Sequence, residues 1–305
     1  MRGRDLLSIA DLTPEELRRI LDLAVDMKRN GYSPLLAGKT LALVFEKASL
    51  RTNVSFSVAM QQLGGQAIYL GQSEVGLGQR ESVADVARVL SRYVDVIAAR
   101  TYAQQTLVDL AQYARVPVIN ALSDEEHPCQ AVADLLTIYE KKGRFHALTL
   151  AFIGDGNNVA ASLVQAAAMV GMSFTIASPA GYELPAETLA QARQWAAKSG
   201  ARIEVTRSPQ EAVKEADVVY TDVWTSMGQE DSYEARLKAF AGYQVNGSLL
   251  AQAPPDAILM HDLPAHRGEE IADGVIEGPQ SVVFDQAENR LHAQRAILAL
   301  LLAEN

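Results

Sequence analysis

The sequence predicts an α/β protein with two doubly wound parallel-sheet domains joined by bridging helices. Short apolar runs alternate with amphipathic stretches along the whole chain, which is the pattern of parallel βα units. The length of 305 residues exceeds what one hydrophobic core usually organises, so two domains are expected. A long helical pattern separates two sets of strand-like runs and supplies the connection.

The first half of the chain is predicted to open with a helix over residues 13–30. Thr13 suits the N-cap because its hydroxyl accepts from first-turn amides, and Pro14 suits the first helical position because its missing N–H needs no partner. Amphipathic stretches at 55–65 and 82–93 predict further helices. Apolar runs predict four strands, at residues 40–46, 66–71, 94–100 and 116–122.

A bridge helix is predicted from His127 to Gly143, and the domain boundary is expected near 143–147. The expected domains are therefore 1–143 and 147–285, with an apolar closing helix over 286–305 that packs back on the first domain. Five strands are predicted in the second domain, at residues 148–155, 173–179, 202–208, 216–222 and 256–262.

Composition excludes several classes of protein. The net charge is −10 and no basic stripe occurs, so nucleic acid is not an expected partner. No apolar run reaches the ~18 residues of a membrane span, and the N-terminus lacks the apolar segment of a secretory signal. The single cysteine, Cys129, cannot form an internal disulfide. We expect a cytoplasmic protein without membrane contact.

Ligands of such sheets bind beyond the carboxyl ends of the strands, so the residues that follow each strand carry the functional prediction. Ser49 is a good N-cap, and the free amides of residues 50–53 would attract an anion, with Arg51 and Thr52 as additional donors. A capped helix with a solvent-exposed arginine is the alternative. The predicted strand 94–100 ends on Arg100.

His127 and Gln130 stand at the start of the bridge helix. The histidine can donate to a carbonyl oxygen, and the glutamine can accept from an amide. A histidine that merely begins a helix is the alternative interpretation.

In the second half, Gly154-x-Gly156 resembles the start of a dinucleotide fingerprint, but Val159 replaces the third glycine. The amides of Asn157 and Asn158 suit a carboxylate or an amino acid backbone. Asp222 ends a predicted strand and would suit a substrate ammonium, with helix capping as the alternative. A polar loop follows, Ser226-Met227-Gly228.

The stretch "LMHDLPAHRGEE" follows the last predicted strand. A zinc site is not supported, because His261 and His266 are five residues apart across Pro264 and neither HExxH nor CxxC accompanies them. Asp262 ends a buried strand, where a carboxylate requires a partner. We therefore predict a substrate-binding loop without a metal.

Seven motifs in this order resemble the ornithine carbamoyltransferase family: "FEKASLRT", "AR" at 99–100, "HPCQAVADLLT", "GDGNN", "DVWTSMGQE", "LPAHRGEE" and "VFDQAENR". The resemblance covers nearly the whole chain. It implies an N-terminal domain that binds carbamoyl phosphate, a C-terminal domain that binds ornithine, and a homotrimer. It also implies carbamoyl transfer to the side-chain amine of ornithine, giving citrulline and phosphate, without a cofactor.

The resemblance implies a role for each site residue. Carbamoyl phosphate would be held by Ser49, Leu50, Arg51, Thr52, Arg100, His127, Gln130 and Arg290. The amino acid would be held by Asn158, Asp222, Ser226, Met227, Asp262 and Leu263. The implied catalytic residues are Arg100, His127, Asp262 and Arg290, because carbamoyl transfer requires positioning, oxyanion donors and charge neutralisation.

Two departures from the family pattern leave alternatives open. The family's Ser-Thr-Arg-Thr-Arg reads Ser-Leu-Arg-Thr-Asn here, so Asn53 removes a positive charge, and the family's His-Cys-Leu-Pro carries Asp262. A carbamoyltransferase for a different amine is one alternative, and a weakened, non-catalytic relative is another. A nicotinamide-dependent oxidoreductase would rest on the two glycines alone. The sequence does not distinguish a biosynthetic role in arginine metabolism from a catabolic one.

Overall fold

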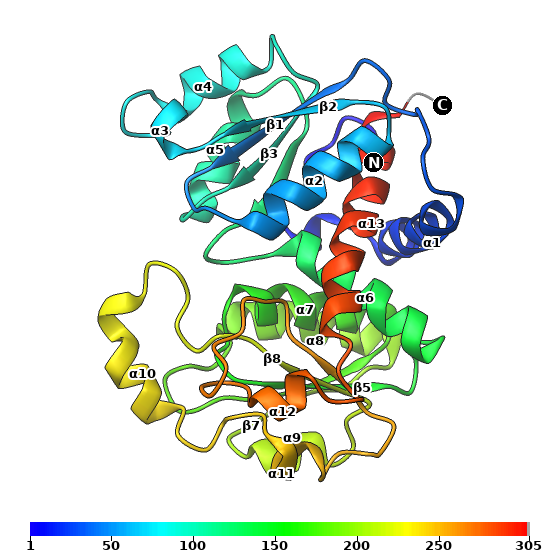
Figure 1. The fold of residues 1–305 in the computed structure, drawn as a ribbon, viewed down its shortest axis with the longest axis vertical. Coiled ribbons are helices and arrows are strands. Elements are labelled where there is room, and N and C mark those ends of the chain that lie inside the picture. Colours follow the sequence, from blue (N-terminus) through cyan, green and yellow to red (C-terminus); the bar gives the residue numbers. More distant parts are fainter. Residues whose placement is uncertain (304–305) are drawn as a thin grey trace. The chain divides into compact units, whose positions relative to one another are not determined.

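The computed structural model describes residues 1–303 and divides into two compact units (Figure 1). Unit 1 comprises Met1–Leu136 and the chain from Glu288 onward, and unit 2 comprises Thr137–Ala287. Each unit contains one parallel sheet with helices, which confirms the predicted fold class. Two helices run across the unit boundaries, α6 (Pro128–Lys142) and α13 (Val283–Leu302).

Unit 1 has a four-stranded sheet in the order β2-β1-β3-β4. Alternate strand residues such as Ala42, Val44 and Ile97 pack with α4 and α5 in one core cluster. The strands are β1 (Thr40–Phe45), β2 (Gln66–Leu70), β3 (Val96–Arg100) and β4 (Val118–Leu122). The remaining helices of this unit are η1 (Ile9–Asp11), α1 (Pro14–Asn30), α2 (Leu50–Gln62), α3 (Gln72–Val75), α4 (Val83–Leu90) and α5 (Gln104–Tyr113).

Unit 2 has a five-stranded sheet in the order β7-β6-β5-β8-β9. The strands are β5 (Thr149–Ile153), β6 (Ser173–Ala177), β7 (Ile203–Thr206), β8 (Val218–Thr221) and β9 (Ile258–Met260). The helices are α7 (Asn158–Val170), α8 (Ala186–Ser199), α9 (Pro209–Val213), η2 (Glu230–Ser232), α10 (Tyr233–Ala239), α11 (Gly247–Leu250) and α12 (Asp273–Ile276). Helix α7 is buried on nearly every side, which explains its alanine-rich sequence.

The strand order reverses direction between β1 and β3 in unit 1 and between β5 and β8 in unit 2. Connections leave these neighbouring strands on opposite sides, which opens a crevice at their carboxyl ends. Ser49 and Arg100 follow or end the first pair, and Asn157 and Asp222 follow the second. The topology therefore positions the predicted site residues at the two places where a ligand is expected.

Each of the nine predicted strands is confirmed within two residues at both ends. Thr13 caps α1 through a capping box with Glu16, as its sequence predicted. The closing helix begins at Val283 rather than at 286, because Val283 and Phe284 have low intrinsic helix propensity and the sequence pattern therefore indicated a later start. Residues 304–305 of that prediction lie outside the described residues. Among the described helices, none is both long and apolar enough to span a membrane.

Candidate active site

The N-terminus of α2 in unit 1 has the predicted geometry of an anion site. Ser49 is the N-cap: its Oγ accepts from the Thr52 amide at 3.2 Å and donates to Thr52 Oγ1 at 3.1 Å. Arg51 lies in the first turn and is half-buried. The Thr52 amide is occupied by Ser49 Oγ and the Asn53 amide by the Ser49 carbonyl oxygen at 3.2 Å, so the amides of Leu50 and Arg51 are the first-turn donors that remain to attract an anion.

Arg290 joins the α2 site to the bridge helix within unit 1. Its Nη1 donates to Gln130 Oε1 at 2.6 Å, and its Nη2 donates to Thr52 Oγ1 at 3.2 Å. Gln130 in turn donates from Nε2 to Asp134 Oδ1 at 2.8 Å. All four side chains are buried, so the network holds a desolvated guanidinium beside the α2 terminus.

His127 is buried next to these cations. Burial, followed by the charges of Arg290 and Arg100, holds the pKa of His127 well below its ordinary value. The imidazole is therefore neutral near pH 7 and keeps one N–H for donation to a carbonyl oxygen. A neutral donor surrounded by fixed cations is suited to a substrate whose oxygen gains negative charge.

Three other predicted residues of unit 1 differ in exposure. Arg100 is half-buried at the end of β3, where a register shift against β4 pairs it with Leu122. The Leu50 side chain is 75% exposed, so any contribution to anion binding comes from its amide. Asn53 accepts from Ser57 Oγ at 3.3 Å and leaves the first turn with Arg51 as its only cation.

In unit 2, Asp222 is buried and held from two directions. Val223 donates its amide to Oδ1, and Asn157 donates from Nδ2 to Oδ2, both at 2.7 Å. Asn157 is also the N-cap of α7, accepting from the amides of Val159 and Ala160. Asp222 therefore belongs to a network and does not cap a helix, which was the alternative interpretation.

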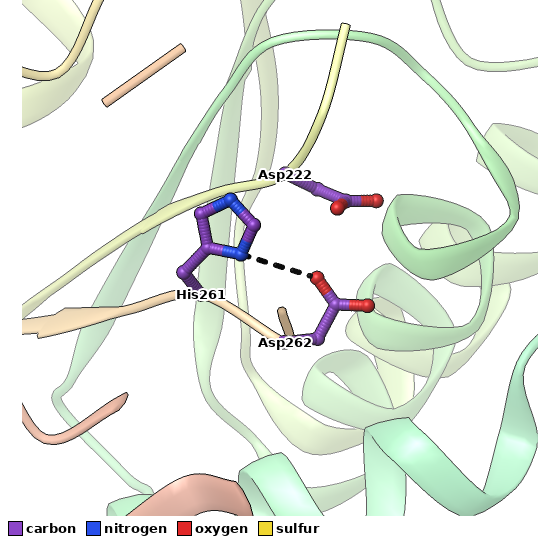
Figure 2. Close-up of side chains that lie close together, drawn as sticks. All are labelled: Asp222, His261 and Asp262. Carbon is purple, nitrogen blue, oxygen red and sulfur yellow. Dashed lines mark ion pairs between the residues drawn. The ribbon is translucent and has the colours of Figure 1, made fainter. Parts of the chain in front are cut away.

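Asp262 lies beside Asp222 at the ends of neighbouring strands (Figure 2). One ligand atom each of Asp222, His261 and Asp262 lie within 4.8 Å of one another. The Asp262 side chain is 11% exposed, and its Oδ1 is 3.6 Å from His261 Nδ1. Two adjacent carboxylates of this kind attract a cation, such as a substrate ammonium.

His261 is locked in one tautomer. Leu263 donates its amide to Nδ1 at 2.9 Å, so Nδ1 carries no proton, while Nε2 lies 3.0 Å from Glu270 Oε1 and donates to it. Both ring nitrogens are thus engaged, and neither offers a lone pair to a metal. This argues against a metal ion between Asp222, His261 and Asp262.

The remaining predicted site residues of unit 2 are Asn158 on α7, Ser226 and Met227 in the loop after β8, and Leu263 in the loop after β9. Asn158 is half-buried in the first turn of α7 and accepts the Val159 amide at 3.0 Å. Ser226 donates its amide to Gln229 Oε1 at 3.1 Å, and the Met227 side chain is 48% exposed. Leu263 has φ +60° ahead of a cis peptide bond to Pro264.

The structure gives Asn157 a contact and adds one residue that the sequence did not single out, Glu270. Asn157 fixes Asp222 by donating from its side-chain amide, and it also caps α7. Glu270 fixes His261 while being completely buried, and nothing in "HRGEE" distinguishes it from a surface acid. Gly156 also gains an explanation: a Cβ there would lie 2.3 Å from the Leu184 amide nitrogen. Close packing requires this glycine, so it is no argument for a pyrophosphate.

Comparisons with known proteins cover both units. Residues 4–140 match the carbamoyl-P binding domain of aspartate/ornithine carbamoyltransferase, and residues 146–301 match the Asp/Orn binding domain. An ornithine carbamoyltransferase of Anoxybacillus flavithermus is 54% identical over 99% of this chain and 98% of its own. An anabolic ornithine carbamoyltransferase of Pyrococcus furiosus is 53% identical, covering 99% and 97%.

A solved structure gives the same result for the fold. The ornithine carbamoyltransferase from Pyrococcus furiosus superimposes with a TM-score of 0.95 at 53% sequence identity. The match covers 99% of this chain and 97% of that chain. At this identity and coverage, the likeness extends to the whole protein.

Proposed function

Since the chain belongs to the aspartate/ornithine carbamoyltransferase family, we propose that it transfers the carbamoyl group of carbamoyl phosphate to the side-chain amine of ornithine. The products are citrulline and phosphate. The observation that carries this proposal is the full-length identity of 54% with an ornithine carbamoyltransferase.

Unit 1 is proposed to bind carbamoyl phosphate. Ser49, Leu50, Arg51 and Thr52 hold the phosphate through first-turn amides and side-chain donors. Arg100, His127, Gln130 and Arg290 hold the carbamoyl end. The support for this assignment is the buried Arg290–Gln130 and Arg290–Thr52 contacts and the neutral state of His127.

Unit 2 is proposed to bind the amino acid. Asp222 binds an ammonium group of the amino acid. Asn158 and the loop of Ser226 and Met227 bind the substituents on its α-carbon, and Leu263 lies beside the side-chain amine. Asp262 stands where the family carries a cysteine, within reach of the same amine. Its closeness to Asp222 supports this assignment.

The proposed reaction balances without a cofactor. The neutral amine nitrogen forms a bond to the carbonyl carbon, the bond from that carbon to the phosphate oxygen breaks, and phosphate leaves with the electron pair. Arg100 and His127 donate to the oxygen that becomes negative, and Asp262 accepts the proton that the amine loses. Preorganised donors of this kind each contribute about 3 kcal/mol to lowering the barrier.

A second candidate is a carbamoyltransferase for a different amine, and the observation in its favour is Asp262. An additional carboxylate near the amine stabilises its charged form, which cannot attack, and this penalty depends on the basicity of each acceptor. The retained cationic network of unit 1 argues against a relative that has lost catalysis.

The test is a stoichiometric assay on the purified protein. With carbamoyl phosphate and ornithine, we expect citrulline by mass spectrometry and one phosphate released for each citrulline. An Arg51→Gln variant controls for contaminating enzyme, because it loses the phosphate cation and should lose turnover. Phosphate release without citrulline would overturn the proposal.

We also propose a homotrimer that works in the cytoplasm in arginine biosynthesis. Unit 1 exposes apolar side chains on α2 and the edge strand β2, where Val54, Ile68 and Tyr69 are 43–49% exposed and would be covered by a neighbouring subunit. Sedimentation equilibrium should give about three times the 33.0 kDa subunit mass. A monomer at micromolar concentration would contradict the assembly.

A further inference from the structure

We propose that His266, Glu269 and Glu270 form a binding site for a divalent transition-metal cation of the Zn²⁺ type. One ligand atom of each residue lies within 4.8 Å of the others. His266 Nδ1 is 3.6 Å from Glu269 Oε2. Two ligands around a zinc ion with bonds of about 2.1 Å stand roughly 3.4 Å apart, so a small adjustment completes the geometry.

Three buried atoms in this group have no hydrogen-bond partner among the described residues. They are His266 Nδ1, Glu269 Oε2 and Glu270 Oε2. Glu270 is completely buried, where a carboxylate oxygen without a partner is costly. Each of the three atoms has a lone pair for a metal ion, which distinguishes this group from Asp222, His261 and Asp262.

The second oxygen of each of the two carboxylates is already fixed, as in metal sites with a supporting outer shell. Tyr233 donates from its hydroxyl to Glu269 Oε1 at 2.8 Å. Glu270 Oε1 accepts from His261 Nε2 and from the His266 amide at 2.6 Å. Gln244 Nε2 donates to the Gly268 and Glu269 carbonyls, and Gly268 makes the turn at φ +94°.

The ligand chemistry selects the class of ion. Two carboxylates and one imidazole suit zinc and related first-row ions, whereas Mg²⁺ and Ca²⁺ prefer oxygen ligands alone. Two carboxylates this close together repel each other, and a divalent cation between them removes that repulsion. The His266 side chain is 42% exposed, so the ion can enter from solvent and keep a water ligand.

The sequence did not predict this site, because the spacing of His261 and His266 does not suit a shared zinc ion. The structure separates the two histidines into different groups. Because Glu270 also holds His261, an ion bound at His266 would stiffen the segment that carries Asp262.

The experiment is calorimetric titration of the full chain, stripped with EDTA, with ZnCl₂ alone. We expect one saturable site per chain, with binding at least 10-fold tighter than for MgCl₂. His266→Ala and Glu269→Gln should each weaken zinc binding at least 10-fold, and both side chains are partly exposed, so these variants should fold. His146→Ala, which removes an exposed histidine elsewhere in unit 2, should leave binding unchanged.

X-ray absorption of the zinc-loaded chain should show one imidazole with oxygen ligands. The proposal is overturned if no saturable site is found, or if His266→Ala binds zinc as the unchanged chain does. Loss of binding in Asp262→Asn with retention in His266→Ala would also overturn it. Because no carbamoyl phosphate or amine is present, the result is independent of the proposed function.

Discussion

Arg290 donates to Gln130 at 2.6 Å across 160 residues of sequence, and both side chains are buried. The contact joins the start of α6 to α13, and Arg290 also donates to Thr52 in the first turn of α2. Because the guanidinium is held from two sides, it is already in place for the carbamoyl phosphate that we propose binds there.

Arg290→Lys should lower kcat/KM for carbamoyl phosphate about 100-fold, since lysine cannot reproduce the two-pronged contact. Steady-state kinetics measures this. Arg295→Lys is the control on the same helix, because Arg295 donates to the backbone carbonyls of Met27 and Gly31 and should affect stability alone. Equal kinetic loss in both variants would contradict the assigned role.

Asn157→Ala should raise KM for the amino acid about 10-fold while leaving KM for carbamoyl phosphate unchanged, because it releases Asp222. It should also cost about 1 kcal/mol of stability through the lost helix cap. Asn246→Ala is a matched control, since Asn246 caps α11 through the Leu249 amide. If both variants changed stability and neither changed KM, Asn157 would be a cap only.

Asp262→Asn should move the acidic limb of the kcat/KM profile for the amine to lower pH. A carboxylate stabilises the neighbouring ammonium and so raises the pH at which the amine becomes neutral, and the amide removes this effect. The maximal rate should fall at the same time if Asp262 accepts the proton. A pH–rate profile identical to that of the unchanged chain would sink the assignment.

Unfolding at different pH tests the buried state of His127. Its folded pKa lies well below the unfolded value of about 6.5, so only the unfolded chain gains the proton as pH falls. Stability should therefore decrease below pH 6.5, by up to ~1.4 kcal/mol per pH unit from this residue. His127→Gln should remove that part of the slope in urea unfolding between pH 5 and 8. Parallel curves for the two chains would show that His127 is not buried in its neutral form.

Cys129 should be chemically inert in the folded protein. Burial raises its pKa to about 12, and its Sγ contacts the Asn120 carbonyl oxygen at 3.4 Å. Ellman's reagent at pH 8 should find no thiol until guanidinium unfolds the chain, and then one. Rapid modification of the native protein would contradict this burial.

The sequence was sufficient to predict the features that follow from hydrophobic periodicity and from the positions of strand ends. Arg51, His127, Asp222 and Asp262 follow the carboxyl ends of β1, β4, β8 and β9, so their positions after predicted strands were enough to single them out. The contacts between them were not predictable in this way. Arg290 and Gln130 are separated by 160 positions, and only the packed helices decide that they meet.

Protonation states were also beyond the sequence. The tautomer of His261 depends on the Leu263 amide and the buried Glu270, two contacts made by the local backbone path. The same backbone path brings Glu270 Oε1 to the amide of His266 and Glu269 Oε2 to the ring of His266. The residue types alone did not indicate that Glu269 and Glu270 make different contacts.

A competition experiment tests whether ornithine is the carbamoyl acceptor of this protein. The purified protein receives carbamoyl phosphate with ornithine, lysine, putrescine and aspartate at equal concentrations, and mass spectrometry identifies the products. We expect citrulline as the dominant product. Dominance of another carbamoylated amine would contradict ornithine as the acceptor, and the absence of every carbamoylated product would contradict the proposed activity itself.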